Sequence, residues 1–401
     1  MRVLFLTCHL PYPPFSGGRL REHELLKRIS EEVDVHVCAV TKTAAADTRA
    51  RAKVRKLCRG ATVFAAAGQG ACPDLPHAAQ VACHASPEAT AFVRGVLGNG
   101  WFDLVHVEGF YLAQHLPPAS PVPVLLVDQN VEFELWRQRM EHAHREADRR
   151  NAFLQYRLTR DAELRAWRAA TACGAVTDDD GATMRRLSPD LDVRLLPDGA
   201  DHLAPVTARV EPDDPALVMT GNFAYQPTAD AAIWFCSEIL PVVEARVPGA
   251  QVLLVGADPP PEVRALAGET VTVTGRVPRI EPYLDRATVV VCPLRVGGGV
   301  KVKVLEALQR GKATVTTSVG AQGLGEGART ALRVADDAAG FAAHVVELLV
   351  HSRERRALAR RARSFAATLP TWADAAAALL ECYGDLAGVE RVAALSKAPS
   401  S

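Results

Sequence analysis

The 401-residue sequence lacks any apolar run long enough to cross a membrane as a helix. Its longest apolar runs have the length of a strand, such as residues 122–127, which contain a proline. A membrane-spanning helix needs roughly 20 residues. The chain also lacks a net charge, because 46 Lys and Arg balance 46 Asp and Glu. No global field recruits nucleic acid or a membrane, so any charge-based function must be local.

Paired metal-binding cysteines are also missing, since none of the nine cysteines forms a C-x-x-C pair. Most of them lie in apolar patterns, where a free thiol behaves as a small buried hydrophobe. Only Cys72, His77, Cys83 and His84 cluster, and their spacing fits no tetrahedral zinc pattern. We therefore expect a reducing, cytoplasmic location and no metal. Since residues 2–7 already show a strand pattern, we also expect no secretory signal.

The chain does contain two successive series of alternating strand and helix patterns. Its length exceeds the size at which one hydrophobic core keeps growing, which favours two domains. Strand–helix alternation predicts parallel sheets covered on both faces, that is, two doubly wound α/β domains facing each other across a cleft. The predicted strands are residues 2–7, 33–40, 61–65, 102–107, 122–127, 174–176 and 193–196, then 216–220, 251–255, 270–274, 288–292, 313–317 and 332–335.

A segment rich in turn and breaker residues, 197–215, separates the two series. We predict a first domain over residues 1–200, a linker over 201–214 and a second domain over 215–375. Residues 376–401 are expected to form a C-terminal helix, packing back on the first domain, and a tail. The charged segment 132–170 predicts one or two extended helices.

The most informative motif lies after the predicted strand 288–292. Gly297, Gly298 and Gly299 allow a close backbone approach to a ligand, and the helix expected to follow presents amides with partial positive charge. Lys303 and Glu306 are three residues apart and share one helix face. A cation suits phosphate and a carboxylate suits sugar hydroxyls. The motif therefore indicates a nucleotide or nucleotide-sugar site.

Several further motifs occur in a specific order: Pro-Phe-Ser-Gly-Gly-Arg, Leu-Pro-Asp-Gly-Ala-Asp, Thr-Gly-Arg-Val and Gly-Lys-Ala-Thr-Val-Thr-Thr. They lie at residues 14–19, 196–201, 274–277 and 311–317, and residues 221–231 and 320–324 complete the series. Together with the glycine motif, this series resembles the retaining glycosyltransferases of family 4, in their triple-glycine subset. The resemblance covers nearly the whole chain and implies the GT-B fold.

The resemblance implies transfer of a sugar from a nucleoside-diphosphate sugar to a hydroxyl acceptor, without a metal or other cofactor. Glu306 would bind the donor ribose, and Arg276 would lie near the base. The candidate catalytic residues are Asp128, Arg295 and Lys303. The candidate donor-binding residues are Gly17, Gly18, Gly221, Arg276, Gly297, Gly298, Gly299, Lys301, Lys303 and Glu306.

The sequence departs from the common family pattern at three places. Gly298 replaces a second glutamate, Gln129 stands where a histidine is usual, and residues 221–230 contain no basic side chain. The diphosphate charge must then be met by Arg295, Lys301, Lys303 or Arg276. Asp128 follows an apolar strand, where it could instead cap a helix.

Two other functions remain open at this stage. One is a nucleotide-sugar epimerase of similar architecture. The other is a catalytically weak scaffold that binds a sugar nucleotide, which would be favoured by Gly298, Gln129 and the absence of basic side chains from residues 221–230. The expected partners are a nucleotide-sugar donor and a carbohydrate or other hydroxyl acceptor. No nucleic acid is expected, and the sequence neither requires nor excludes a peripheral membrane contact.

Overall fold

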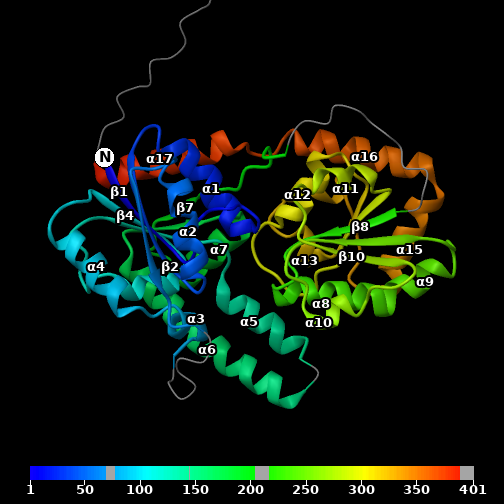
Figure 1. The fold of residues 1–401 in the computed structure, drawn as a ribbon, viewed down its shortest axis with the longest axis horizontal. Helices are drawn as coiled ribbons and strands as arrows, with labels where there is room; N and C mark the ends of the chain where they lie inside the picture. Colours follow the sequence, from blue (N-terminus) through cyan, green and yellow to red (C-terminus); the bar gives the residue numbers. More distant parts are fainter. Residues whose placement is uncertain (69–76, 144, 204–215, 389–401) are drawn as a thin grey trace, which may run out of the picture.

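The computed structural model describes residues 1–68, 77–143, 145–203 and 216–388, which form two α/β halves lying side by side (Figure 1). Each half contains one sheet whose strands are all parallel. The prediction of two facing, doubly wound α/β units is confirmed. Most of the predicted linker, Cys72 and the end of the predicted tail lie outside the described residues.

The first sheet has seven strands in the order β3-β2-β1-β4-β5-β6-β7. The order starts at β1 and moves outward in both directions, which creates a switch point between β1 and β4. The strands are β1 (Arg2–Thr7), β2 (Asp34–Thr41), β3 (Gly60–Ala65), β4 (Leu104–Glu108), β5 (Val124–Asp128), β6 (Ala172–Ala175) and β7 (Val193–Leu195). The helices are α1 (Gly17–Ile29), α2 (Ala44–Val54), α3 (Ala79–Cys83), α4 (Pro87–Gly98), η1 (Phe110–His115), α5 (Glu132–Glu141), α6 (Glu146–Ala169) and α7 (Asp178–Leu187).

The second sheet has six strands in the order β10-β9-β8-β11-β12-β13. They are β8 (Ala216–Thr220), β9 (Gln251–Val255), β10 (Val271–Gly275), β11 (Val289–Cys292), β12 (Thr314–Thr316) and β13 (Arg333–Val334). The helices are α8 (Gln226–Trp234), α9 (Leu240–Glu244), α10 (Pro261–Arg264), α11 (Glu281–Arg286), α12 (Val302–Gln309), α13 (Ser318–Ala321), α14 (Ala328–Ala331), α15 (Ala338–Val350), α16 (Ser352–Ala366) and α17 (Trp372–Ala387).

Prolines explain two differences from the sequence prediction. β5 begins at Val124 and not at Val122, because Pro123 has no N–H for the ladder. The helix expected over residues 229–245 is broken between α8 and α9 by a π-helical turn, Phe235–Ile239. Pro241 follows that turn and cannot donate the next helical hydrogen bond, which accounts for the local rearrangement.

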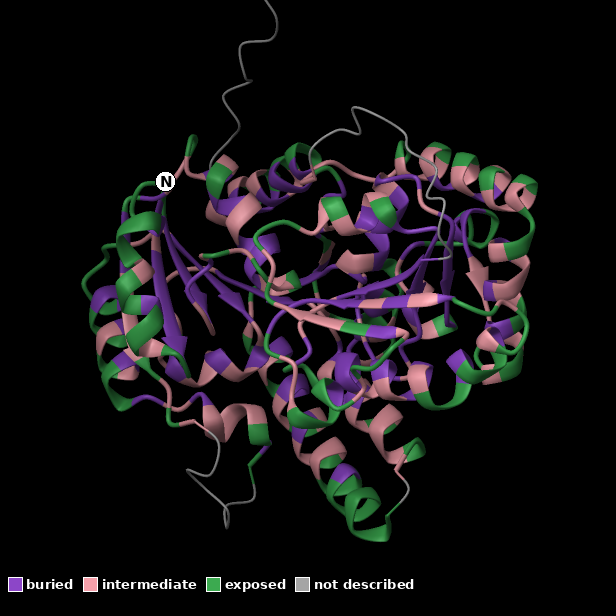
Figure 2. Ribbon diagram, turned by 45° about the vertical axis from the view of Figure 1, so that its right-hand side comes forward, coloured by how far each residue is buried: buried purple, intermediate pink, exposed green. Residues whose placement is uncertain are grey.

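Both faces of the first sheet are covered. One face packs on α1 and α17 through Val3, Leu25, Trp372 and Tyr383, and the other packs on α4, α6 and α7 through residues such as Val93 and Trp167. Figure 2 shows both sheets as buried layers under partly exposed helices. The fold therefore aligns the carboxyl ends of two parallel sheets toward the junction of the halves.

The chain crosses between the halves twice, and the two crossings touch. α16 packs in the second core through Leu358, whereas α17 lies on the first sheet beside α1 (Figure 1). The amide of Ala200, on the first crossing, donates to the Pro370 carbonyl at 2.9 Å. The amide of Trp372 donates to the Asp201 carboxylate at 2.7 Å. The two connections are thus hydrogen-bonded to each other.

Candidate functional site

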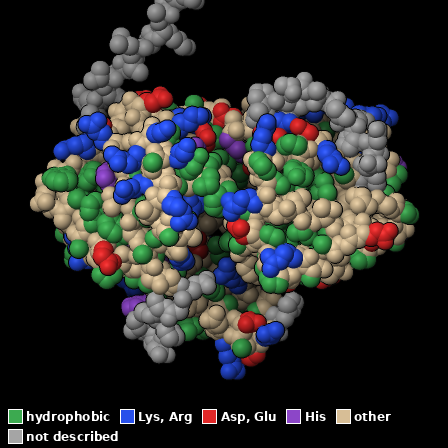
Figure 3. Space-filling view, viewed as in Figure 1, with side chains coloured by type: hydrophobic (Ala, Val, Ile, Leu, Met, Phe, Trp, Pro, Cys, Tyr) green, Lys and Arg blue, Asp and Glu red, His purple; other side chains and the backbone are tan. Residues whose placement is uncertain are grey.

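A cavity of about 880 Å³ lies between the two halves. Its walls come from loops at the carboxyl ends of strands in both sheets: residues 13–18 and 129–130 of the first, and residues 220–222, 255–257, 276–281, 294, 296–298 and 300–303 of the second. Figure 3 shows the hollow between the halves, with Lys and Arg side chains around it. In open α/β sheets, ligands bind at this edge.

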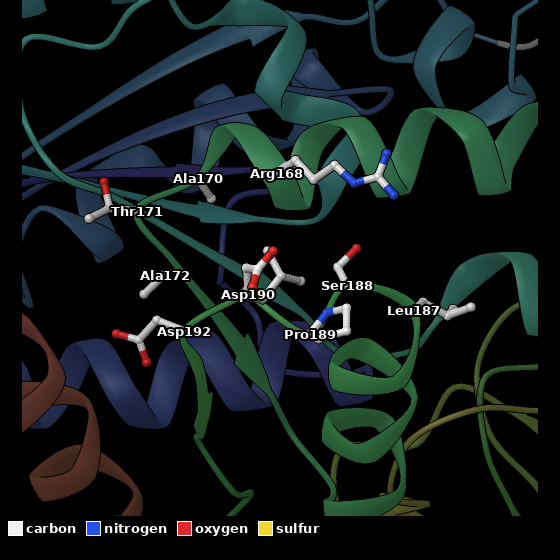
Figure 4. A pocket seen from close by; sticks show the side chains of 10 residues that line it. Arg168, Ala170, Thr171, Ala172, Leu187, Ser188, Pro189, Asp190 and Asp192 are labelled. Atoms are coloured by element: carbon white, nitrogen blue, oxygen red, sulfur yellow. The ribbon is translucent and has the colours of Figure 1, made fainter.

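A smaller cavity of about 310 Å³ lies at the amino ends of strands of the first sheet, opposite to the end that faces the larger cavity (Figure 4). It is bounded by the end of α6, the start of β6 and the loop from α7 to β7, with Arg168, Asp190 and Asp192 among its residues. This position is at the amino ends of the strands, away from the second half. The larger cavity is therefore the candidate functional site.

The glycine motif lies at a close contact between the two domains. Gly299 has φ +59°, and a Cβ there would clash with the Gln129 carbonyl oxygen. A Cβ on Gly298 would lie 2.9 Å from Cβ of Asn130. The amide of Gly297 donates to Oε1 of Gln138, on α5, at 2.8 Å. These glycines are thus required by the domain contact as well as by access to the cavity, which Gly297 and Gly298 line.

Lys301 stabilises this loop from within. Its ammonium donates to the carbonyls of Gly298, at 2.9 Å, and Gly299, at 2.7 Å. Burial lowers the pKa of Lys301 to about 8, because desolvation disfavours the charged form. Lys301 lines the cavity, but two of its three N–H donors already serve the loop carbonyls.

Lys303 and Glu306 lie on the cavity-facing side of α12, as their spacing predicted. The Lys303 ammonium donates to Oγ1 of Thr228 at 3.1 Å, and burial lowers its pKa. One carboxylate oxygen of Glu306 lies 3.1 Å from Nε2 of His202, a residue just after the first domain. The Glu306 side chain is 13% exposed. His202 therefore holds the Glu306 carboxylate at the cavity wall, where the side chain remains partly exposed to the cavity.

Arg295 does not line the cavity. It forms a two-point ion pair with Asp230, at 2.6 and 3.0 Å, and its guanidinium lies over the Trp234 ring, 5.3 Å from the centroid. These contacts hold it on α8, so the expectation that it neutralises the diphosphate lacks geometric support. Arg276 does line the cavity, where it pairs with Asp258 at 2.9 Å and lies 4.3 Å from the centroid of the Phe15 ring.

Asp128 is buried and does not line the cavity either. Its two oxygens accept hydrogen bonds from the amide of Phe110, at 2.8 Å, and from Nε1 of Trp167, at 2.6 Å. It thus caps the start of η1, the alternative that the sequence left open for it. Burial raises its pKa to about 7 despite these two donors. A direct catalytic role for Asp128 has no support in this geometry.

The neighbours of Asp128 reach the cavity instead. Gln129 and Asn130 both line it. The side-chain amide of Gln129 donates to Oε2 of Glu108 at 3.0 Å, and Oε1 of Glu108 lies 2.9 Å from Nε2 of His106. A buried carboxylate therefore fixes the orientation of Gln129.

The remaining predicted glycines all line the cavity. A Cβ on Gly17 would lie 3.4 Å from Cγ2 of Val302, and one on Gly18 would lie 3.1 Å from Oε1 of Gln129. A Cβ on Gly221 would lie 3.1 Å from Nζ of Lys303. The amino end of α1 and the turn after β8 therefore approach the same space from opposite domains.

Sequence reasoning missed several polar residues of the cavity: Thr220, Thr228, His202 and Asn130. Thr220 ends β8 and Thr228 lies in the first turn of α8, so their positions at a strand end and a helix start were available signals. Within residues 1–68, 77–143, 145–203 and 216–388, no three His, Cys, Asp or Glu side chains are grouped as metal ligands. None of the described helices is long and apolar enough to cross a membrane.

Comparison with known proteins agrees with this architecture. Residues 214–351 match the family of group 1 glycosyl transferases, and this segment spans the second sheet from β8 to β13. A search of the curated proteins gives no match. Residues 214–351 thus match a glycosyltransferase domain, and the prediction of a glycosyltransferase enzyme is confirmed at this level.

Three solved structures show the same fold over nearly the whole chain. Sucrose-phosphate synthase from Thermosynechococcus elongatus has a TM-score of 0.75 at 17% identity, covering 97% of this chain and 100% of that one. HepE from Anabaena, in complex with UDP, has a TM-score of 0.68 at 12% identity, covering 96% and 100%. WaaG, a glycosyltransferase of lipopolysaccharide biosynthesis, has a TM-score of 0.64 at 15% identity, with the same coverage. The architecture is therefore the predicted GT-B fold.

Proposed function

Since residues 214–351 match a group 1 glycosyltransferase domain, we propose that the protein is a retaining transferase of family 4, triple-glycine subset. It moves a sugar from a nucleoside-diphosphate sugar to a hydroxyl acceptor. One observation supports this best: Lys303 and Glu306 of the second domain face the same cavity as Gly17, Gly18 and Gln129 of the first. The second domain would bind the donor, and the first would bind the acceptor.

The chemistry of the cavity suits departure of a nucleoside diphosphate. The leaving group develops negative charge in the transition state, and a fixed ammonium in a desolvated site stabilises that charge. Lys303 supplies it, so we propose that no metal ion is required. Glu306, oriented by His202, suits the two neighbouring hydroxyls of a ribose.

Retention is proposed to follow a front-face mechanism, in which the departing phosphate accepts the proton of the acceptor hydroxyl. The carboxylates that line the cavity all have partners: Glu24 pairs with Arg28, Asp198 with Arg21, Glu281 with Arg279 and Glu306 with His202, while Glu132 accepts from Gln80. A carboxylate held in this way is poorly placed to attack the sugar. The arrangement therefore supports a mechanism without an enzyme nucleophile.

The donor sets the first experiment. HepE was solved with UDP and with UDP-glucose, so uridine nucleotides are the first to test. A thermal-shift panel of UDP, GDP, ADP, dTDP and their sugars identifies the donor, because a ligand of the folded state raises its stability. Binding of none of them would contradict the proposal.

Product analysis with that donor then tests the reaction. Incubation with carbohydrate, lipid-linked and small hydroxyl acceptors should give a glycoside with the anomeric configuration of the donor, read by proton NMR, and EDTA should leave the rate unchanged. An isomerised donor formed without acceptor would instead show an epimerase. Donor binding without turnover on any acceptor would show a scaffold. All the described cysteines are free, which fits a reducing, cytoplasmic compartment for this reaction.

A further inference from the structure

The ammonium of Lys303 is a buried cation that forms no ion pair among the described residues, although the Glu306 carboxylate attracts it from the same helix. Across the described residues, no carboxylate lies within ion-pair distance of its Nζ, and its hydrogen-bond partner is a neutral hydroxyl, Oγ1 of Thr228, at 3.1 Å. The other cavity cations are engaged differently: Arg276 and Arg279 have carboxylate partners, and Lys301 donates to loop carbonyls. Burying an unpaired charge is costly, so this site is suited to an anionic ligand.

Two threonine hydroxyls belong to the same cavity wall as this ammonium. Thr228 lines the cavity, and because its oxygen accepts from Lys303, its own proton remains available to a ligand. Thr220 also lines the cavity, is 3% exposed, and its Oγ1 has no hydrogen-bond partner among the described residues. A buried hydroxyl without a partner costs free energy, which a ligand oxygen would recover.

The turn at Gly221 brings these groups together. A Cβ on Gly221 would lie 2.8 Å from Cγ2 of Thr228 and 3.1 Å from Nζ of Lys303. Thr220 precedes this turn, and Thr228 lies in the first turn of the nine-residue helix α8, whose amino end adds a partial positive charge. The Thr228 side chain, the Lys303 ammonium and the amino end of α8 therefore lie together at the Gly221 turn, where any added side chain would contact them.

We propose that the donor diphosphate is bound by this subsite, defined by Lys303 and the hydroxyls of Thr220 and Thr228 at the Gly221 turn. The inference rests on the proposed function, since it assigns residues to that donor. The two hydroxyls take the place of the basic side chains that residues 221–230 lack. Arg295, paired with Asp230, and Lys301, bound to the glycine loop, do not contact the diphosphate.

Affinity for a nucleoside diphosphate and its nucleoside separates phosphate binding from general damage. The probes are UDP and uridine, measured by isothermal titration calorimetry, or the equivalent pair if the panel identifies GDP, ADP or dTDP. Thr228→Val and Thr220→Val keep the branched shape and remove the hydroxyl. Each should weaken UDP binding about 10-fold, as expected for one lost hydrogen bond to a charged group, and change uridine binding less than about twofold.

Variants that keep the hydroxyl test whether it is the group that binds the diphosphate. Thr228→Ser and Thr220→Ser retain the hydroxyl and should restore UDP affinity to within about threefold of the wild type. Lys303→Met should weaken UDP binding about 100-fold, because it removes a buried charge-assisted contact. The matched control is Thr272→Val, on an exposed position of β10, which should leave both affinities unchanged.

The outcomes distinguish this inference from the function on which it rests. If wild-type protein binds none of the nucleotides, the proposed function fails. If it binds UDP and both valine variants retain that affinity, or lose uridine affinity equally, the function stands and the threonine subsite is wrong. A loss of UDP binding in Arg295→Ala as large as in Lys303→Met would also overturn the assignment.

Discussion

The Oη of Tyr383 lies 2.7 Å from Nδ1 of His106. Tyr383 is on α17, at the end of the described chain, whereas His106 is on the central strand β4. Nε2 of His106 lies 2.9 Å from Oε1 of Glu108. The side-chain amide of Gln129, at the cavity wall, donates to Oε2 of the same carboxylate at 3.0 Å. All the groups between Tyr383 and Gln129 are buried. The C-terminal helix is therefore connected to the candidate site by a continuous chain of hydrogen bonds.

Replacing Tyr383 by Phe should destabilise this connection. The variant keeps the ring but leaves Nδ1 of His106 buried without a partner, which costs about 1–3 kcal/mol. Tyr156→Phe is the control, since Tyr156 packs on Phe133 and its substitution should cost less than about 0.5 kcal/mol. Urea unfolding followed by Trp fluorescence measures both, because the buried Trp372 begins α17. Equal urea midpoints of unfolding for the two variants would contradict a stabilising hydrogen bond between Tyr383 and His106.

Glu306→Ala should weaken UDP binding about 10-fold through lost hydrogen bonds to the ribose hydroxyls. The loss should vanish with 2′,3′-dideoxyuridine diphosphate, which has no such hydroxyls. Glu326→Ala removes a highly exposed carboxylate and serves as the control. A loss of the same size for both ligands would show that Glu306 does not bind the ribose. Calorimetry at constant pH gives both affinities.

Gly299→Ala should damage the junction of the domains. The added Cβ meets the Gln129 carbonyl, and φ of +59° is unfavourable for alanine. Gly268→Ala is matched as a control, since nothing lies within 4 Å of its Cβ position. We expect the first variant to lose more than about 2 kcal/mol in unfolding free energy, and the second to change little. Thermal unfolding of the two variants checks this, and similar melting temperatures would be inconsistent with the observed contact.

Asp128 should make stability depend on pH. Burial raises its folded-state pKa from 3.8 to about 7, so between these values the folded state retains a proton that the unfolded state has released. The folded state binds more protons there, and stability therefore decreases as pH rises from about 4 to 7. Below about pH 4 Asp128 is protonated in both the folded and the unfolded state, and its full contribution to the free energy of unfolding is present.

The variant Asp128→Asn removes this titration. The unfolding free energy of the wild type, relative to the variant, should fall by up to about 4 kcal/mol across the same window. Urea titrations at several pH values measure the difference, in which contributions from groups that do not interact with Asp128 cancel. Glu163 is not among them, because burial and the nearby Asp128 both raise its pKa. A constant difference from pH 4 to pH 7 would disprove the assigned pKa.

The fold was largely predictable because the strands are short apolar runs bounded by breakers. Residues 2–7, 216–220 and 251–255 were predicted with the bounds of β1, β8 and β9. Periodicity reports burial, and parallel strands are buried on both faces. The break between α8 and α9 was less accessible, since it depends on how Pro241 and the core rearrange the backbone together.

The candidate site was predictable only in part. Lys303 and Glu306 were recovered because helical spacing fixes which side chains share a face. The positions of Arg295 and Asp128 outside the cavity lining were not predictable, since sequence position cannot show that Asp230 and Trp167 bind them. His202 was missed because an isolated polar residue in a connecting segment carries little local signal, and Thr220 and Thr228 were missed although a strand end and a helix start marked them. Their roles arise from contacts made across the tertiary structure.

The two hydrogen-bonded crossings between the domains limit how the halves can move. Two connections that lie together act as a single pivot line, so rotation about that line is the motion that leaves both unstrained. His202 and Glu306 lie close to it, whereas the contact of Gln138 with Gly297 is formed by α5, on the part that projects away from α17 (Figure 1). The part of the cavity wall at His202 would then keep its shape, while the wall at Gly297 could move relative to the first domain.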